Sequence, residues 1–480
     1  MGIIHLSKIA LSKKSRRATG SVLAVVASLM LGSIAAGLAT AVSLTHYPLL
    51  LSLILLFILV AMVPIIYRLM TNSFDAFEAE NVAILFYSLY SLSVPLHVLL
   101  SPEVSTLQLN LVTNAFGLCL VGLLFFLVGY HNPLGSNLAR MFPPLPRRWG
   151  KRRTKVISYV YLLLGVALFL GLISIVGVLT YFQAGYAGRA WLKREFGPLE
   201  LGLYIIQIGL VLHIFYYSLA KKRPPFGVIA AYALYLLLIM KIGIRRPLLG
   251  LLLASLAVWH YRVKKISFRQ AVVITIVFGS ALVLFAFVRQ PIASQGFIAG
   301  IKYFINNFSW AWFDLSRTEL GAPFRNLLDI LTIVPDEIGY LYGSSYWQSL
   351  ENLLPRFVHP SRPPTLSEWY TNTFFPEAFI QAGGNMGFFI ISEAYINWGV
   401  IGVMIVMFGW GVLLKAFYAY MKSDLTNTSA LFLYSISLAW IVFVMRIDFA
   451  GAFKGFLITT FLPAMFAIIL ITTKLRLVKS

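Results

Sequence analysis

Charged residues are scarce in this chain. Only 12% of its 480 residues are Asp, Glu, Lys or Arg, whereas a soluble domain carries about 25%. Apolar residues make up 59% of the chain, and the mean hydropathy is +0.82. So few charges cannot cover a water-exposed surface, which excludes an ordinary soluble protein. The composition predicts an all-α polytopic protein embedded in a lipid bilayer.

Cysteine is nearly absent as well. The single one, Cys119, lies inside an apolar run, which excludes disulfides and cysteine-based metal sites within one chain. The acids are too scattered to indicate a dedicated metal site, and we predict neither a metal nor a cofactor.

The sequence also lacks a P-loop, an H-E-x-x-H motif, a G-x-S-x-G motif and a glycine-rich dinucleotide fingerprint. These absences argue against nucleotide-driven transport, zincin chemistry and serine hydrolysis.

Long apolar runs are what the chain has instead, and they predict about twelve transmembrane helices. Their approximate ranges are 21–44, 48–70, 82–100, 108–130, 157–180, 201–219, 226–243, 247–260, 270–289, 386–414, 429–446 and 455–473. The first follows a basic start and is long enough to stay in the membrane. The run 386–414 is too long for a simple span, so we expect a bend near Gly399 and Gly402.

These runs divide the chain into three parts. Residues 1–289 hold the first nine predicted helices, residues 290–385 form one large loop, and residues 386–480 hold the last three helices. Loops of this length in compact proteins are usually functional or disordered. This one is rich in aromatic residues, which argues against disorder. We therefore expect it to carry the function.

The distribution of basic residues predicts the orientation. With the N-terminus in the cytosol, 25 of the 39 Lys and Arg residues but only 4 of the 17 acids fall on the cytosolic side. This is a strong positive-inside pattern. It accounts for the formal net charge of +22 without a nucleic-acid partner. Both termini are therefore expected in the cytosol, and residues 290–385 on the outer face.

Several cations are expected at the outer face, where Lys and Arg are normally rare. Because arginine suits bidentate phosphate binding, guanidinium groups in three outer loops predict a diphosphate site. The alternatives are interface anchoring, a solvated surface and a local ion pair with Asp448. The candidate diphosphate-binding residues are Lys241, Arg245, Arg246, Arg189 and Arg446.

Two side chains are candidates for a general base. Glu393 lies on an apolar segment one turn before Asn397, and a hydrogen bond between helices is the alternative interpretation. His359 lies in a proline-rich part of the loop, where a histidine is more often structural. Aromatic and polar side chains in and after the loop are expected to bind sugar rings. These glycan-binding candidates are Trp310, Trp312, Arg356, Arg362, Tyr395 and Asn397.

One segment resembles a known family. GGNMGFFIISEAYINWGVIG (383–402) resembles the stretch after the large periplasmic loop of bacterial O-antigen and exopolysaccharide repeat-unit polymerases, the Wzy class. GIRRPLLG (243–250) is similar to the G-x-R-R element of that class. Where the class has a serine, this chain has Phe388 or Phe389. The matching positions are Gly243, Arg245, Arg246, Gly387, Glu393, Tyr395, Asn397, Gly399 and Gly402.

The resemblance implies a GT-C-like helical fold in the bacterial inner membrane and a metal-independent glycosyltransferase. The donor would be a growing glycan on undecaprenyl diphosphate, and the acceptor a sugar hydroxyl of another undecaprenyl-diphosphate-linked oligosaccharide at the periplasmic face. A chain-length regulator and a flippase would be partners. Arg245 and Arg246 would stabilise the leaving diphosphate, and Glu393 or His359 would accept the hydroxyl proton.

Two other functions stay open. An O-antigen ligase uses the same chemistry with a lipid A core as acceptor. A lipid-linked oligosaccharide flippase or transporter also fits the number of predicted spans. It would be expected to carry charges midway along its spans and to have short outer loops, whereas the charges here cluster at one face.

Overall fold

The computed structural model describes residues 47–101, 104–183, 189–221, 223–354, 358–377 and 386–473. The first predicted span, residues 21–44, lies outside these ranges. Within them the secondary structure is helical, with turns and irregular connections and no strand. Each predicted span from residue 48 onward coincides with a helix, because a long apolar run can satisfy its backbone in a bilayer only by forming one.

Eight helices of the described chain are long and apolar enough to cross a membrane, so the protein is a multi-pass α-helical membrane protein. They are α2 (Pro48–Met70), α3 (Ala79–Leu100), α4 (Thr106–His131), α6 (Lys151–Val176), the Leu199–Ala220 part of α8 (Arg189–Ala220), α11 (Phe268–Gln295), α17 (Ile390–Ser423) and the run Phe449–Thr472. That last run comprises α19 (Phe449–Phe456), η3 (Leu457–Phe461) and α20 (Leu462–Thr472). Two shorter apolar helices are α9 (Phe226–Ile242) and α18 (Thr428–Val444). Helix α10 (Arg246–Arg262) is also short, with 17 residues. The count of twelve spans stays a prediction.

Close helix pairs hold the bundle together. The main ones are α4 with α17, α6 with α8, and α10 with α18. A methyl group at Gly129 of α4 would lie only 2.1 Å from the carbonyl oxygen of Phe408 on α17. At Gly165 of α6 it would lie 2.7 Å from the carbonyl oxygen of Gly202 on α8. Glycine thus lets these backbones approach, as small residues generally do between membrane helices.

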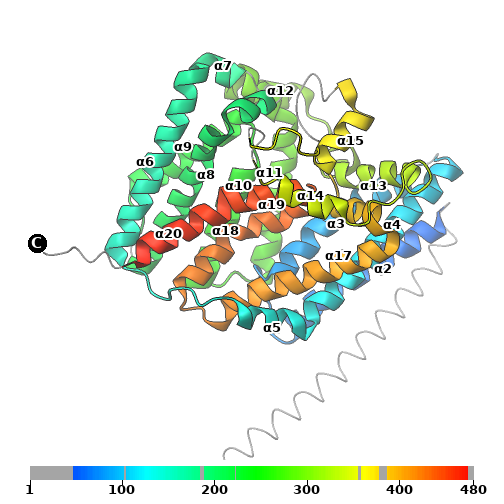
Figure 1. Ribbon diagram of the computed structural model, residues 1–480, viewed down its shortest axis with the longest axis horizontal. Helices are drawn as coiled ribbons and strands as arrows, with labels where there is room; N and C mark the ends of the chain where they lie inside the picture. The colour runs from blue at the N-terminus through cyan, green and yellow to red at the C-terminus, as the bar shows by residue number, and fades with distance from the viewer. Residues whose placement is uncertain are drawn as a thin grey trace, which may run out of the picture.

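The bundle has two different ends (Figure 1). The described part of residues 290–385 lies in the upper half of the view, and we call this the loop end. The opposite end carries α5 (Pro133–Met141) and the connections 141–150 and 262–269, and we call it the basic end. The loop is itself largely helical. It holds α12 (Phe297–Asn307), η1 (Trp310–Phe313), η2 (Leu315–Arg317), α13 (Ala322–Ile333), α14 (Ser344–Glu351) and α15 (Leu366–Phe374).

Helix α17 bends where the glycines predict it. Trp398 and Gly399 leave the helical conformation, and Gly399 has a φ of +60°, which favours glycine. A methyl group at Gly402 would lie 2.1 Å from the carbonyl oxygen of Ala394, so the two halves of α17 meet closely. The expected bend is confirmed. It separates the stretch Ile390–Asn397 from the rest of the helix and brings it against residues 341–345 of the loop.

The orientation can be tested by cysteine labelling. Ser361 of the loop and Ser423, the last residue of α17, are both exposed, whereas the native Cys119 is fully buried. In intact cells, a membrane-impermeant maleimide is expected to label Ser361→Cys, and to label Ser423→Cys only after permeabilisation. The wild-type chain is the control for background labelling. Labelling of residue 423 in intact cells would reverse the proposed orientation.

Candidate functional site

Three arginines converge on Glu319 at the loop end. Arg289 Nη2 lies 2.6 Å from Glu319 Oε1, and Arg245 Nη1 lies 3.2 Å from Glu319 Oε2. Arg446 Nη2 lies 3.4 Å from the same Oε2. The exposed fraction of these side chains runs from 16% for Arg245 to 28% for Glu319. The group is therefore partly shielded but still open to solvent, and we call it the arginine cluster.

Each arginine stands at the end of a different helix. Gly243 has a φ of +81° and ends α9, so the chain turns within two residues and Arg245 becomes the N-cap of α10. Arg289 lies in the last two turns of α11, and Arg446 follows α18 directly. The carboxylate comes from the connection between η2 and α13. Four remote stretches of sequence thus form one site.

The electrostatics of the arginine cluster favour anions. Burial raises the pKa of the Glu319 carboxyl, but the charges of Arg245, Arg446 and Arg289 outweigh this effect and hold the pKa below its ordinary value. Glu319 is therefore ionised near neutral pH. Three guanidinium groups thus contact one carboxylate, and arginines in such an arrangement suit an anionic group.

The predicted diphosphate residues do not all meet in this cluster. Arg245 and Arg446 join it, but the guanidinium carbon of Arg246 lies 5.0 Å from the ring centre of Trp440, between α10 and α18. Lys241 Nζ donates to the carbonyl oxygens of Ile292 and Ala293, at 2.9 and 2.7 Å. The side chain of Arg189 lies outside the described part of the chain.

Sequence reasoning did not single out two members of the arginine cluster, Arg289 and Glu319. Arg289 could have been predicted as a member of the site, because it stands at the outer end of a predicted span, as the other candidate cations do. Glu319 lies in a polar stretch of the loop among several other acids, and nothing in a single sequence pairs it with any arginine.

Glu393 is buried, with only 3% of its surface exposed. Its Oε1 accepts a hydrogen bond from the hydroxyl of Ser345 at 3.1 Å, and its Oε2 accepts one from the backbone N–H of Phe449 at 2.6 Å. The two donors belong to α14 and to the start of α19. The carboxylate therefore joins the loop and the last span to α17. These bonds match the alternative interpretation of Glu393, a hydrogen bond between helices.

Asn397 extends this connection by one turn. Its Nδ2 donates to Ser345 Oγ at 2.8 Å and to the carbonyl oxygen of Glu393 at 2.7 Å. Its Oδ1 accepts from the N–H of Gly343 at 2.9 Å. The Asn397 side chain thus makes two hydrogen bonds to residues 343–345 of the loop and one to its own helix. In this way Asn397 anchors the loop to α17.

Gly387 allows a second close approach in the same motif. A methyl group at this position would lie 2.6 Å from the carbonyl oxygen of Arg446. That oxygen accepts the N–H of Phe388 at 3.1 Å, and the carbonyl oxygen of Met445 accepts the N–H of Ile390 at 3.2 Å. The segment before α17 therefore lies along the backbone of Arg446. The motif that carries the family resemblance thus positions one member of the arginine cluster.

The predicted base and glycan residues of the loop are dispersed. His359 Nε2 lies 3.9 Å from Glu351 Oε2, and the histidine side chain is 35% exposed. Arg362 Nη1 donates to the carbonyl oxygens of Asn352 and Leu354, both at 3.0 Å. Arg356 and the side chain of Trp310 lie outside the described part of the chain.

Trp312 and Tyr395 make contacts within the protein. The ring of Trp312 stacks on Phe287 of α11 with 4.7 Å between ring centres, and Trp312 is 9% exposed. Tyr395 is half-buried, with its ring centre 6.2 Å from that of Tyr340. Sequence reasoning missed the most exposed aromatics of the loop, Tyr342 and Trp347, which are 77% and 69% exposed.

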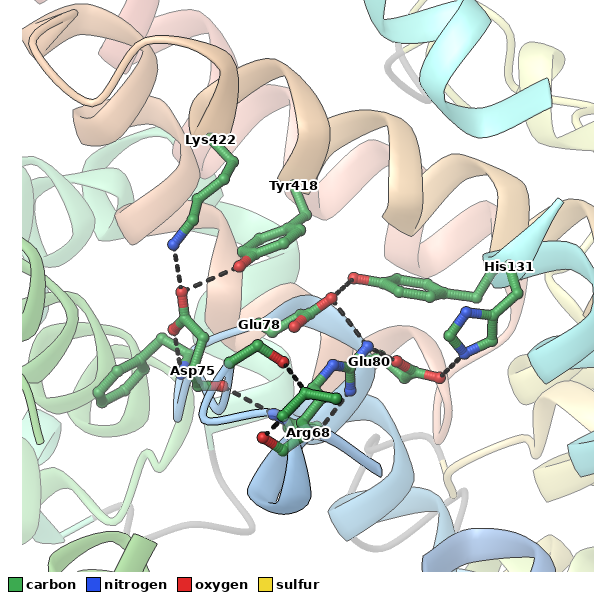
Figure 2. Close-up of polar contacts among 12 residues, drawn as sticks. Arg68, Asp75, Glu78, Glu80, His131, Tyr418 and Lys422 are labelled. Atoms are coloured by element: carbon green, nitrogen blue, oxygen red, sulfur yellow. Dashed lines mark hydrogen bonds and ion pairs between the residues drawn. The ribbon is translucent and has the colours of Figure 1, made fainter. Parts of the chain in front are cut away.

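A second charged group lies at the basic end (Figure 2). Asp75 accepts hydrogen bonds from Lys422 Nζ and from the hydroxyl of Tyr418, both at 2.9 Å. Figure 2 shows Arg68 between Glu78 and Glu80, its Nη2 lying 2.9 Å from Glu78 Oε1 and paired with Glu80 as well. A further bond of 2.8 Å joins His131 to Glu80.

In this basic-end network every carboxylate faces a cation. Burial raises the pKa of Asp75, but its bonds to His260 and Lys422 outweigh burial and lower that pKa below its ordinary value. The residues come from α2, α3, α4, α10 and α17 and the connection between α2 and α3. Such a network holds helix ends together, since breaking it would leave a charge buried without its partner. We assign it a structural role and take the arginine cluster as the candidate site.

The role of Asn397 as an anchor can be tested by Asn397→Ala. The change leaves the N–H of Gly343 without its acceptor, and loss of a buried partner typically costs about 1–3 kcal/mol. We expect a lower midpoint of thermal unfolding in detergent and weaker protein accumulation. Asn307→Ala, which removes only an exposed bond to the carbonyl oxygen of Tyr303, is the control. Equal stability of the two variants would contradict the anchoring role.

Comparison with known proteins assigns no function to this site. Scans against protein-family models, curated proteins and solved structures gave no match to this chain. The resemblance to repeat-unit polymerases therefore depends on the motif residues alone. The proposed function below is based on the arginine cluster and its surroundings.

Proposed function

We propose that this protein is an inner-membrane polysaccharide polymerase that uses a lipid-diphosphate-linked glycan as donor. One observation carries the proposal: Arg245, Arg289 and Arg446 meet at the ends of three spans, around a single carboxylate. A diphosphate attached to a membrane lipid lies at the membrane surface, at the level of such helix ends. Guanidinium groups bind its oxygens through paired hydrogen bonds.

The proposed reaction exchanges one bond for another. A sugar hydroxyl of a second lipid-linked unit attacks the anomeric carbon of the donor, and a new glycosidic bond forms as the bond to the diphosphate breaks. The electron pair of the broken bond remains on the diphosphate. The arginine cluster stabilises this developing charge, which is the main catalytic effect available to fixed cations near a partly shielded site. The proton of the hydroxyl passes to a base.

Glu319 acts as the resident anion of the cluster in this proposal. Its two carboxylate oxygens accept contacts from all three arginines, as the oxygens of a diphosphate would. A bound diphosphate carries more negative charge than one carboxylate and reaches more donors. It therefore competes with Glu319 for the same guanidinium groups, and the carboxylate keeps them in place until the donor arrives.

Of the two candidate bases, His359 is the more accessible. Its side chain is 35% exposed and Glu351 lies beside it. Glu393 is 3% exposed, and both of its oxygens already accept hydrogen bonds. We propose His359 as the base and Glu393 as a positioning residue that holds the loop. The exposed aromatics Tyr342 and Trp347 are added to the glycan-binding candidates.

The acceptor separates a polymerase from a ligase. Both enzymes would use the same anion site, because the donor and the leaving group are the same. Purified protein given lipid-linked repeat units alone is expected to produce a ladder of products. A single product formed only when a lipid A core is added would identify a ligase, and movement of lipid without a new bond would identify a flippase.

Replacing Arg245, Arg289 or Arg446 by alanine is expected to lower the rate of transfer about 100- to 1000-fold, the usual loss when one donor to a transition-state anion is removed. The readout is polymer formation from lipid-linked substrate, normalised to folded protein. Arg246→Ala should cost less, because Arg246 stacks on Trp440 and is not among the contacts of Glu319. Replacement by lysine should restore little, since the planar fork is lost.

Arg317→Ala is the matched control for these variants. Arg317 is 71% exposed and pairs with Asp314 in the same loop. The Arg317→Ala substitution therefore removes one positive charge outside the arginine cluster. It should leave the rate unchanged. If Arg245→Ala, Arg289→Ala and Arg446→Ala all polymerise normally, the arginine cluster is structural and the proposed function loses its main support.

Glu319→Gln is expected to tighten the binding of inorganic pyrophosphate about tenfold, because the competing negative charge is gone. The measurement is the shift of thermal unfolding of the full-length protein in detergent over a pyrophosphate titration. Glu337→Gln, an exposed acid of the same loop, controls for net charge. Weaker binding in Glu319→Gln than in wild type would mean that Glu319 organises the arginines and does not compete for them.

A further inference from the structure

A cavity of about 440 Å³ lies at the basic end, opposite the arginine cluster. Leu256 of α10 and Val273 and Ile274 of α11 form apolar walls. Lys264, Lys265 and Arg269 line it from the connection between the two helices and from the first turn of α11. The cavity thus combines an apolar interior with three cations, and neither the proposed reaction nor the basic-end network uses it.

The cavity arises from the way that α10 and α11 diverge. Helix α10 packs mainly against α8 and α18, whereas α11 packs mainly against α9 and α12. With 17 residues, α10 is about 25 Å long at 1.5 Å per residue, less than the roughly 30 Å of a bilayer core. The 28-residue α11 is long enough to cross. The end of the short helix therefore lies within reach of lipid.

The three cations have no acidic partner within the described ranges. Lys264, Lys265 and Arg269 are exposed, and no ion pair there includes any of them. In contrast, Lys422 at the same end is paired with Asp75. Trp259 also lines the cavity and is 52% exposed, as expected for a tryptophan at a membrane surface. An exposed tryptophan beside cations and apolar walls is typical of the level at which lipid headgroups meet acyl chains.

We propose that this cavity binds one anionic phospholipid. The phosphate of the headgroup contacts Lys264, Lys265 and Arg269, and an acyl chain lies against Leu256, Val273 and Ile274. The volume falls in the range of about 300–1000 Å³ typical of small-molecule sites. Apolar walls favour a lipid over a free phosphate, and the three unpaired cations favour an anionic over a zwitterionic headgroup. The occupant stabilises the hairpin of α10 and α11.

Native mass spectrometry of the full-length protein in detergent tests this site. Phosphatidylglycerol is titrated against phosphatidylcholine, and the bound lipid is counted. We expect one phosphatidylglycerol retained at low concentration and no equivalent retention of phosphatidylcholine. Combined Lys264→Gln, Lys265→Gln and Arg269→Gln should weaken retention about 100-fold, since each basic residue near an anionic headgroup contributes substantially.

Two further variants test the role of the cations and of the cavity separately. Arg148→Gln, Lys151→Gln and Arg152→Gln together remove the same charge from exposed positions elsewhere at the basic end, and this triple variant should retain the lipid as wild type does. Ile274→Trp fills the cavity with all cations in place, and it should also lose the lipid.

Equal weakening by both triple variants would overturn the site in favour of diffuse charge attraction. Retention by Ile274→Trp would overturn the acyl-chain contact, and equal retention of phosphatidylcholine would overturn the role of the cations. Competition by free glycerol phosphate as strong as that by phosphatidylglycerol would show a phosphate site without a lipid, and would also overturn the proposal.

Discussion

Mutual repulsion among three guanidinium groups is the constraint on which the loop end depends. Arg245, Arg289 and Arg446 come from separate helices or their ends, and like charges that share one partner repel one another. Glu319 offsets this repulsion, because its two carboxylate oxygens lie 2.6–3.4 Å from guanidinium nitrogens of all three arginines. The same contacts tie residues 290–385 to the spans, so the candidate site and the attachment of the loop are one feature.

The two ends of the bundle use charge differently. At the basic end each carboxylate has its own cationic contact, since Lys422 donates to Asp75 and Arg68 lies between two glutamates. At the loop end three arginines contact the carboxylate of Glu319. A compensated network stabilises a fold and has little affinity left for a ligand. Arginines that converge on one carboxylate can also bind an anionic ligand, which is why the function is expected at the loop end.

Much of the fold follows from the sequence, but the site does not. Apolar runs predict the helices that coincide with the predicted spans, because a bilayer allows few other solutions, and the glycines predict the bend of α17. The helices α5 and α12 to α15 lie outside every predicted span. Contacts between side chains depend on tertiary geometry. Adjacent Arg245 and Arg246 have different neighbours, because consecutive residues of a helix start face different sides. Glu393 is informative as an acid in an apolar segment, but its partners lie about fifty residues away on both sides.

The way Glu319 is held explains how an anion could replace it without unfolding the loop. Arg325 of α13 donates to the carbonyl oxygens of Ser316 and Thr318, so the backbone before Glu319 has its own support. Asn397 and Glu393 fasten the loop to α17 independently of the arginines. Removal of the Glu319 carboxylate from the arginine cluster then requires a change of its side-chain rotamer and leaves these backbone bonds in place. Exchange between a carboxylate and a diphosphate is therefore local, and the spans keep their packing during the proposed reaction.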